Sequence, residues 1–313
     1  MMMGIKRIAK EGLTNPFGDA RTVKQAFPEG VPAVDSDPFL MCDYFDTVEK
    51  EGTAKHEDDF PVNWHPHRGF DIATYLKSGT GRHGDSLGNR ETFSTPGMQW
   101  MSTGSGIEHA EGGGNEKGVY VQGFQIWVNV PSERKMDDPR YGTVPTSDLP
   151  LVHLDGGATA RVLAGDALGV HGPFETVQPV QMIDFEVPKD GTATFDIAPG
   201  LNTALLYIYE GAMESVNADG PFEAGHIVVF DGYSEEHRGI AIKASSVHEK
   251  GGKAMLFAGK KLREPIAWRG PIVMNTQQQI HDTLIELRTG KFPPKRVSWD
   301  YKRLSNKPTT AQT

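Results

Sequence analysis

Two pairs of residues carry the side chains best suited to chemistry. His65 and His67 form one pair, His109 and Glu111 form the other, and within each pair the two residues are two positions apart. On a β-strand, residues i and i+2 project from the same face, so two neighbouring strands could direct three imidazoles and one carboxylate at one point. Nitrogen and oxygen ligands of this kind suit iron, manganese, nickel, copper or zinc. We therefore predict a non-haem metal site with His65, His67, His109 and Glu111 as ligands.

The sequence between the two pairs predicts β-structure. Residues 70–77 alternate with period two, and 98–101 read as a second short strand. Glycines between 79 and 88 and the segment 95–97 supply turns, because glycine tolerates a positive φ. A histidine pair alone is often not a metal site, but a second pair on a separate strand favours one. The pattern suits a small β-barrel or sandwich, which can hold a site in its mouth.

Length and composition narrow the class of protein. A chain of 313 residues with 36 Gly and 21 Pro and little helical periodicity predicts two mostly β domains. The net charge of 32 − 41 = −9 argues against direct binding of nucleic acid or an anionic membrane. The single cysteine, Cys42, excludes an intrachain disulfide and lies in an apolar run, where we expect a buried, inert thiol. The sequence contains no apolar stretch long enough to predict a membrane span or a leader. We therefore expect a cytoplasmic protein.

The second half of the chain weakly repeats the first. Residues 205–211 resemble 72–79, and residues 224–232 resemble 96–104. We predict an N-terminal domain over 1–145 that holds the metal site and a C-terminal domain over 146–313. When the second repeat is aligned with the first, only one of the four ligand positions holds a candidate ligand. That residue is His237, which stands opposite His109. We therefore expect no metal in the C-terminal domain.

One helix is predicted near the C-terminus. Thr276 suits an N-cap, and the apolar residues Ile280, Leu284 and Leu287 recur at helical spacing before Gly290. We expect a helix over about 276–289 that packs on a sheet face, followed by a tail.

With these motifs in place, the chain resembles the pirin family of the cupin superfamily. The matching segments span residues 37 to 276: 37–40 (DPFL), 65–70 (HPHRGF), 85–89 (DSLGN), 96–97 (PG), 99–101 (QWM), 104–107 (GSGI), 109–111 (HAE), 127–131 (WVNVP), 135–136 (KM), 139–141 (PRY), 270–271 (GP) and 273–276 (VMNT). The resemblance implies an all-β bicupin, two double-stranded β-helix (jelly-roll) barrels with the short C-terminal helix. It also implies one metal, usually Fe²⁺, on His65, His67, His109 and Glu111. Asp71 replaces the Glu common in the family after the HRGF run, and we expect it behind the ligands or at the surface.

The resemblance also suggests an activity. Some pirin-like proteins open the flavonol quercetin with dioxygen, which suggests a quercetin 2,3-dioxygenase-type oxidoreductase acting on a flavonoid or another small aromatic substrate. A loosely held Glu111 would serve as both ligand and general base. Residues around the ligands are candidates for the pocket wall or for plain core, namely Phe70, Asp71, Gln99 and Met101, whereas Trp100 and Trp127 are expected in the core.

Two other functions remain open. One is a redox-sensing regulator that acts through protein partners and uses the oxidation state of its metal as a switch. The other is a cupin whose ligands mainly stabilise the barrel. The Irving–Williams order lets Mn, Ni, Cu or Zn replace iron in such a site.

Overall fold

Both segments that hold the predicted ligand pairs are β-strands in the computed structural model of the chain: β5 (Val62–His67) and β10 (Ile107–Gly113). The structure describes residues 1–15, 23–48, 60–113, 119–215, 220–231, 233–234, 236, 238–246, 248–298 and 300–302. His237, the remaining candidate ligand of the second repeat, lies outside these residues.

The chain forms two compact units that differ from the two continuous halves expected from the sequence. Unit 1 comprises Met1–Tyr44 and Ser147–Arg263, and unit 2 comprises Phe45–Thr146 and Glu264–Thr313. The change of unit at 146/147 lies close to the expected boundary. However, residues 1–44 belong to the same unit as 147–263, and residues 264–313 belong to the same unit as 45–146. The reason is long-range pairing: the first strand, β1 (Gly4–Lys10), pairs antiparallel with β21 (His226–Asp231) in unit 1.

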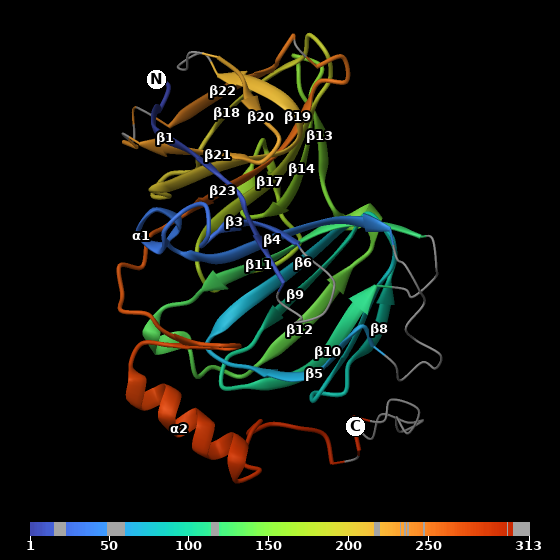
Figure 1. Cartoon of the computed structure of the whole chain (residues 1–313), viewed down its shortest axis with the longest axis vertical. Helices are drawn as coiled ribbons and strands as arrows, with labels where there is room; N and C mark the ends of the chain where they lie inside the picture. Colours follow the sequence, from blue (N-terminus) through green and yellow to red (C-terminus); the bar gives the residue numbers. More distant parts are fainter. Residues whose placement is uncertain are drawn as a thin grey trace. The chain divides into compact units, whose positions relative to one another are not determined.

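Unit 2 holds the predicted site and consists of a four-stranded sheet, four strands of a larger sheet, a hairpin and a helix. Its further elements are β6 (Phe70–Ser78), β7 (Gly81–Asp85), β8 (Arg90–Phe93), β9 (Gly97–Ser102), β11 (Tyr120–Asn129), the 3₁₀ turn η1 (Ser132–Arg134), β12 (Arg140–Val144), β24 (Ala267–Arg269), β25 (Ile272–Met274) and α2 (Gln277–Arg288). One sheet has the order β5-β10-β7-β8, and the other contains β12-β9-β6-β11 (Figure 1). Side chains of β9 and β11 donate hydrogen bonds to a side chain of β10, so the two sheets face each other across the site.

Helix α2 confirms the prediction for the C-terminal region. Thr276 and Gln279 form a capping box, which satisfies backbone N–H groups at the helix start. Ile280 is buried and packs with Leu284 against β24 and β25. The helix therefore packs on a two-stranded hairpin.

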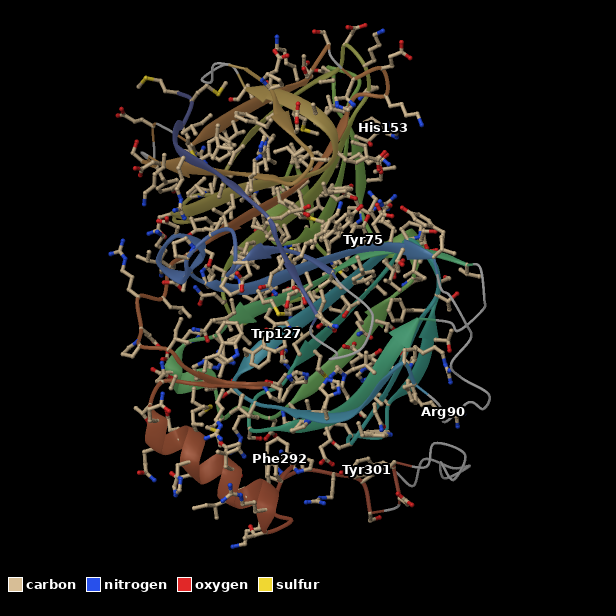
Figure 2. All side chains as sticks on the ribbon, viewed as in Figure 1. Tyr75, Arg90, Trp127, His153, Phe292 and Tyr301 are labelled. Atoms are coloured by element: carbon tan, nitrogen blue, oxygen red, sulfur yellow. The ribbon has the colours of Figure 1, made fainter. Side chains whose placement is uncertain are left out.

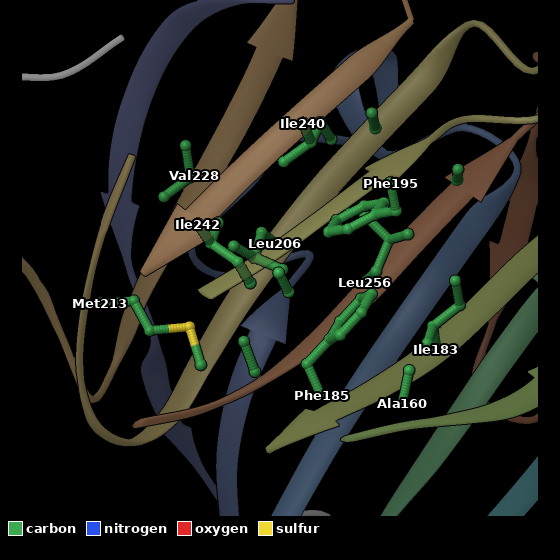
Figure 3. Packing of buried hydrophobic residues seen from close by; sticks show 14 of the residues in the cluster. Ala160, Ile183, Phe185, Phe195, Leu206, Met213, Val228, Ile240, Ile242 and Leu256 are labelled. Carbon is green, nitrogen blue, oxygen red and sulfur yellow. The ribbon is translucent and has the colours of Figure 1, made fainter. Parts of the chain in front are cut away.

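Unit 1 is a β-structure built around one large apolar core. Its strands and turns are β1, β2 (Gly12–Thr14), β3 (Val23–Phe27), the helical turn α1 (Ala33–Ser36), β4 (Phe39–Val48, which continues into unit 2), the 3₁₀ turn η2 (Thr146–Asp148, at the boundary), β13 (Leu151–His153), β14 (Thr159–Ala164), β15 (Asp166–Ala167), β16 (Val170–His171), β17 (Val180–Val187), β18 (Thr192–Asp196), β19 (Thr203–Ser215), β20 (Phe222–Glu223), β21, β22 (Gly239–Ala244) and β23 (Gly252–Gly259). Strand β18 shows the alternation that builds this core, since Ala193 and Phe195 are buried while the neighbouring Thr192, Thr194 and Asp196 are exposed. Figure 3 shows Phe195 beside Phe185 in this core, with ring centroids 4.5 Å apart.

The internal repeat seen in the sequence is present in the strand pairing. In unit 2, β6 pairs with β9 and β11; in unit 1, β19 pairs with β21 and β23. In unit 1, Ile197, which aligns with His65, is fully buried in the apolar core. Within the described ranges, no helix combines the length and the apolar character needed to span a membrane.

Candidate metal centre

The register of three neighbouring strands brings the candidate ligands to one face. On the central strand β10, His109 lies opposite His65 of β5 and opposite Asp85 of β7. Two residues further along β10, Glu111 lies opposite His83 of β7. Directly opposed residues share a face of an antiparallel sheet, and so do residues i and i+2. This face therefore carries histidines from β5, β7 and β10.

The three predicted histidines are in mutual contact. The ring centroids of His65 and His109 are 4.3 Å apart, those of His65 and His67 4.7 Å, and those of His67 and His109 4.9 Å. One ring nitrogen from each lies within 4.8 Å of one from each of the others. His67 and His109 are buried, and His65 is partly exposed. The structure therefore brings these three predicted ligands together.

Backbone carbonyls fix two of the rings in a form suited to a metal. His65 Nδ1 donates to the carbonyl of Asn63 at 2.7 Å, and His67 Nδ1 donates to the carbonyl of Pro271 at 3.2 Å. A ring that donates through Nδ1 keeps the lone pair on Nε2. Metal-bound histidines use this arrangement, in which the outer hydrogen bond sets the tautomer.

His109 gives the clearest indication that these residues can bind a metal. Both of its ring nitrogens are buried and have no hydrogen-bond partner among the described residues. Burial, and then the neighbouring His65 and His67, hold the pKa of His109 well below its usual range. The pKa of His67 is also well below its usual range, again because of burial first. Neutral imidazoles are the form that binds metal ions, so the donor set fits a divalent cation.

Glu111 is held firmly and not loosely as expected, because Gln99 Nε2 donates to Oε2 at 3.0 Å and Gln125 Nε2 donates to Oε1 at 2.6 Å. Tyr141 in turn donates to Gln99 Oε1 at 3.1 Å. The carboxylate forms a close group with His109 and His83, whereas His65 and His67 group with His109 without it. The four predicted ligands and His83 thus form two close groups that share His109.

His83 is the site residue that the sequence reasoning missed. It is fully buried, its ring stacks on Tyr141 with centroids 3.9 Å apart, and its Nε2 lies 3.0 Å from Asp85 Oδ2. His83 and Asp85 are two residues apart on β7, the same spacing that singled out the two ligand pairs. That spacing was a usable signal, but only the register of β7 with β10 shows that His83 faces Glu111.

The other candidates around the ligands are buried. Asp71 is not at the surface, since only 2% is exposed, and it accepts a hydrogen bond from Trp100 Nε1 at 3.0 Å. Burial raises the pKa of Asp71 to about 6. Met101 is core.

An aromatic wall lies beside His67. The rings of Phe70 and Trp127 pack against it, with centroids 5.5 Å and 5.4 Å from the imidazole. Trp127 also contacts Trp268 at 5.8 Å, and its buried Nε1 has no hydrogen-bond partner among the described residues. Figure 2 shows Trp127 within the strands of this unit. Trp127 is therefore core by burial but contacts a candidate ligand.

Two buried cations fix the turn after His67. Arg68 donates to the carbonyl of Ser105 and, on α2, to Thr283 and Glu286. Lys135 Nζ donates to the carbonyl of Gly69 at 2.7 Å, and burial lowers its pKa to about 8. At Gly69, φ is +89° and a Cβ would lie 2.1 Å from the carbonyl of Val273, so only glycine fits the turn.

Comparison with known proteins assigns the family. Residues 20–128 match the pirin family, and residues 182–293 match the pirin C-terminal cupin domain. The chain is 31% identical over 293 residues to a pirin-like protein of Caulobacter vibrioides, covering 93% of this chain and 100% of that protein. It is 33% identical over 290 residues to a Pseudomonas aeruginosa protein provisionally named quercetin 2,3-dioxygenase, with 88% and 94% covered.

A solved structure agrees in fold. The crystal structure of a quercetin 2,3-dioxygenase from Acinetobacter baumannii matches with a TM-score of 0.82 and 27% identity, covering 94% of this chain and 99% of that one. The expected fold of two cupin-type domains, with little helix beyond the short C-terminal one, is confirmed. The chain belongs to the pirin family of bicupin proteins.

Proposed function

We propose that this protein is a metal-dependent dioxygenase that opens flavonols such as quercetin. The ion is Fe²⁺, held by His65, His67, His109 and Glu111. The observation that carries the proposal is His109, a fully buried imidazole in contact with two further histidines. Neither of its ring nitrogens has a hydrogen-bond partner among the residues that the structure describes. Leaving a buried polar atom unpaired costs about 1–3 kcal/mol, and a cation bound at one of these nitrogens removes that cost for the nitrogen it binds.

A bound divalent cation would lower the pKa of a coordinated enol or phenol and offer a position for dioxygen. The same donor set accepts Mn, Ni, Cu or Zn, so the ion found in isolated protein depends on supply.

Glu111 acts as the general base in this proposal. A carboxylate has about four lone-pair sites, and the amides of Gln99 and Gln125 occupy two of them. The remaining sites can accept the proton of the flavonol hydroxyl. The two amides hold the carboxylate in place, so that it meets the hydroxyl at a fixed position.

The aromatic residues beside His67 support the site from the core. The rings of Phe70 and Trp127 are buried and pack against each other, with centroids 4.4 Å apart. The flavonol class itself is supported by the names of two relatives, the Pseudomonas aeruginosa protein and the Acinetobacter baumannii enzyme.

The test is aerobic turnover of quercetin by protein loaded with Fe²⁺, with metal content measured on the same sample. We expect loss of the flavonol absorbance in the wild type and in His171→Gln, a control at an exposed histidine of unit 1. H109Q should lose both metal and turnover, and E111Q should lose turnover while the three histidines retain the ion. Full metal occupancy without turnover would refute the dioxygenase and favour the redox-sensing regulator.

A further inference from the structure

His83 and Asp85 form a pair whose geometry fixes the protonation of the imidazole. The Asp85 carboxylate is itself held by the backbone N–H groups of Leu87 and Asn89 and by Asn89 Nδ2, at 2.8–3.0 Å. It faces His83 Nε2 at 3.0 Å and acts as an acceptor. The proton of the neutral ring therefore sits on Nε2, and the lone pair is on Nδ1.

That lone pair lies on a buried nitrogen. His83 Nδ1 makes no hydrogen bond within the described part of the chain, while one face of the ring is covered by Tyr141. A carboxylate that holds one ring nitrogen while the other is free is the arrangement of carboxylate–histidine–metal triads. His83 thus has the carboxylate contact at Nε2 that a metal-bound histidine has, and its Nδ1 is the nitrogen that could bind an ion.

Two further donors lie within reach. A ring nitrogen of His83, one of His109 and a carboxylate oxygen of Glu111 all lie within 4.8 Å of one another. Two imidazoles and one carboxylate are the donor set of facial-triad and catalytic metal sites. Glu111 is in this group in its present position, with both amide hydrogen bonds intact.

We propose that His83, His109 and Glu111 form a second coordination position for a divalent cation, beside the position of the proposed function. The proposal rests on the metal site of the proposed function for its ion. His109 and Glu111 belong to both positions, so the two positions are alternatives for one ion. His65 and His67 complete the first position, and His83 completes the second.

The experiment uses Co²⁺ as probe, with binding measured by calorimetry and by the visible d–d absorption of the bound ion. The double variant H65Q/H67Q removes the first position and should still bind one Co²⁺ per chain. Adding H83Q should abolish that binding, and adding D85N should weaken it roughly 10–100-fold, the usual effect of losing an outer-shell contact. Adding H171Q, at an exposed histidine, should leave it unchanged.

The outcomes separate this inference from the proposed function. If the wild type binds no Co²⁺, the metal site of the proposed function is refuted. If the wild type binds but folded H65Q/H67Q does not, only the second position is refuted. It is equally refuted if H83Q leaves the binding of H65Q/H67Q intact.

A second measurement covers the case in which H83Q does not fold. In H65Q/H67Q protein labelled with ¹⁵N-histidine, Co²⁺ should shift and broaden the Nδ1 resonance of His83 strongly, and that of His171 not at all. An unshifted His83 resonance in Co²⁺-loaded protein would overturn the proposal.

Discussion

Arg68 and Glu286 lie 218 residues apart in the chain and form an ion pair, with Nη2 2.5 Å from Oε2. The guanidinium is 3% exposed and the carboxylate 35%. The pair links α2 to Arg68, which directly follows the candidate ligand His67 in the chain. Arg68 also donates to Thr283 and lies over the ring of Phe292 at 5.0 Å.

Replacing Arg68 should therefore destabilise unit 2. R68M removes the Arg68 donor from the buried carbonyl of Ser105 and from the hydroxyl of Thr283, which keeps its own bond to the carbonyl of Gln279. We expect a loss of about 2–4 kcal/mol in the free energy of unfolding. E286Q should cost less, about 1 kcal/mol or below, because the carboxylate is partly in water. Urea unfolding monitored by tryptophan fluorescence measures both, with R288Q on the exposed end of α2 as the control. Equal losses for R68M and E286Q would contradict this account.

His109 should oppose stability when no metal is bound. In H109L a side chain of similar size replaces two unpartnered nitrogens, so metal-free protein should gain about 1–3 kcal/mol. The same variant should lose the rise in Tm that Fe²⁺ or Co²⁺ gives the wild type. Thermal unfolding with and without metal shows both effects. If metal-free H109L protein is less stable than the metal-free wild type, the unpaired ring nitrogens of His109 do not destabilise the fold.

Gln125 should tune metal affinity from outside the ligand set. Its amide donates to Glu111 at 2.6 Å, and Q125L removes that bond. We expect metal affinity to fall roughly 10–100-fold with little change in Tm of the metal-free protein. Calorimetric titration with Co²⁺ tests this, and Q125N, which shortens the amide, should fall between. Unchanged affinity in Q125L would mean that Glu111 is not a ligand.

Asp71 predicts a particular pH dependence of stability. Burial raises its pKa to about 6, from 3.8 in the unfolded chain, so the folded state binds the extra proton between these values. The stabilisation is complete below about pH 4 and is lost as the pH rises to 6, by up to about 3 kcal/mol. D71N should flatten unfolding free energies measured from pH 4 to 7, while D155N, at an exposed site, should not. A wild-type profile that rises across this range with no change in D71N would contradict it.

The sequence indicated those parts of the site that depend on local spacing. The i, i+2 pairs at His65 and His109 do lie on strands, and the capping box at Thr276 does begin a helix. His83 has the same spacing to Asp85, but its role depends on which strand pairs with β10 and in which register. Local patterns carry no such information. The exchange of chain ends between the units, with β1 on β21, is non-local in the same way.

The carbonyl that orients His67 has a consequence for biosynthesis. It belongs to Pro271, which follows His67 by 204 residues, so every candidate ligand leaves the ribosome long before the group that sets the tautomer of one of them. A nascent chain arrested after residue 250 would contain all the candidate ligands. It would lack Pro271, the hairpin of β24 and β25, and α2. We therefore expect tight capture of the ion to follow the synthesis of Pro271, the hairpin and α2.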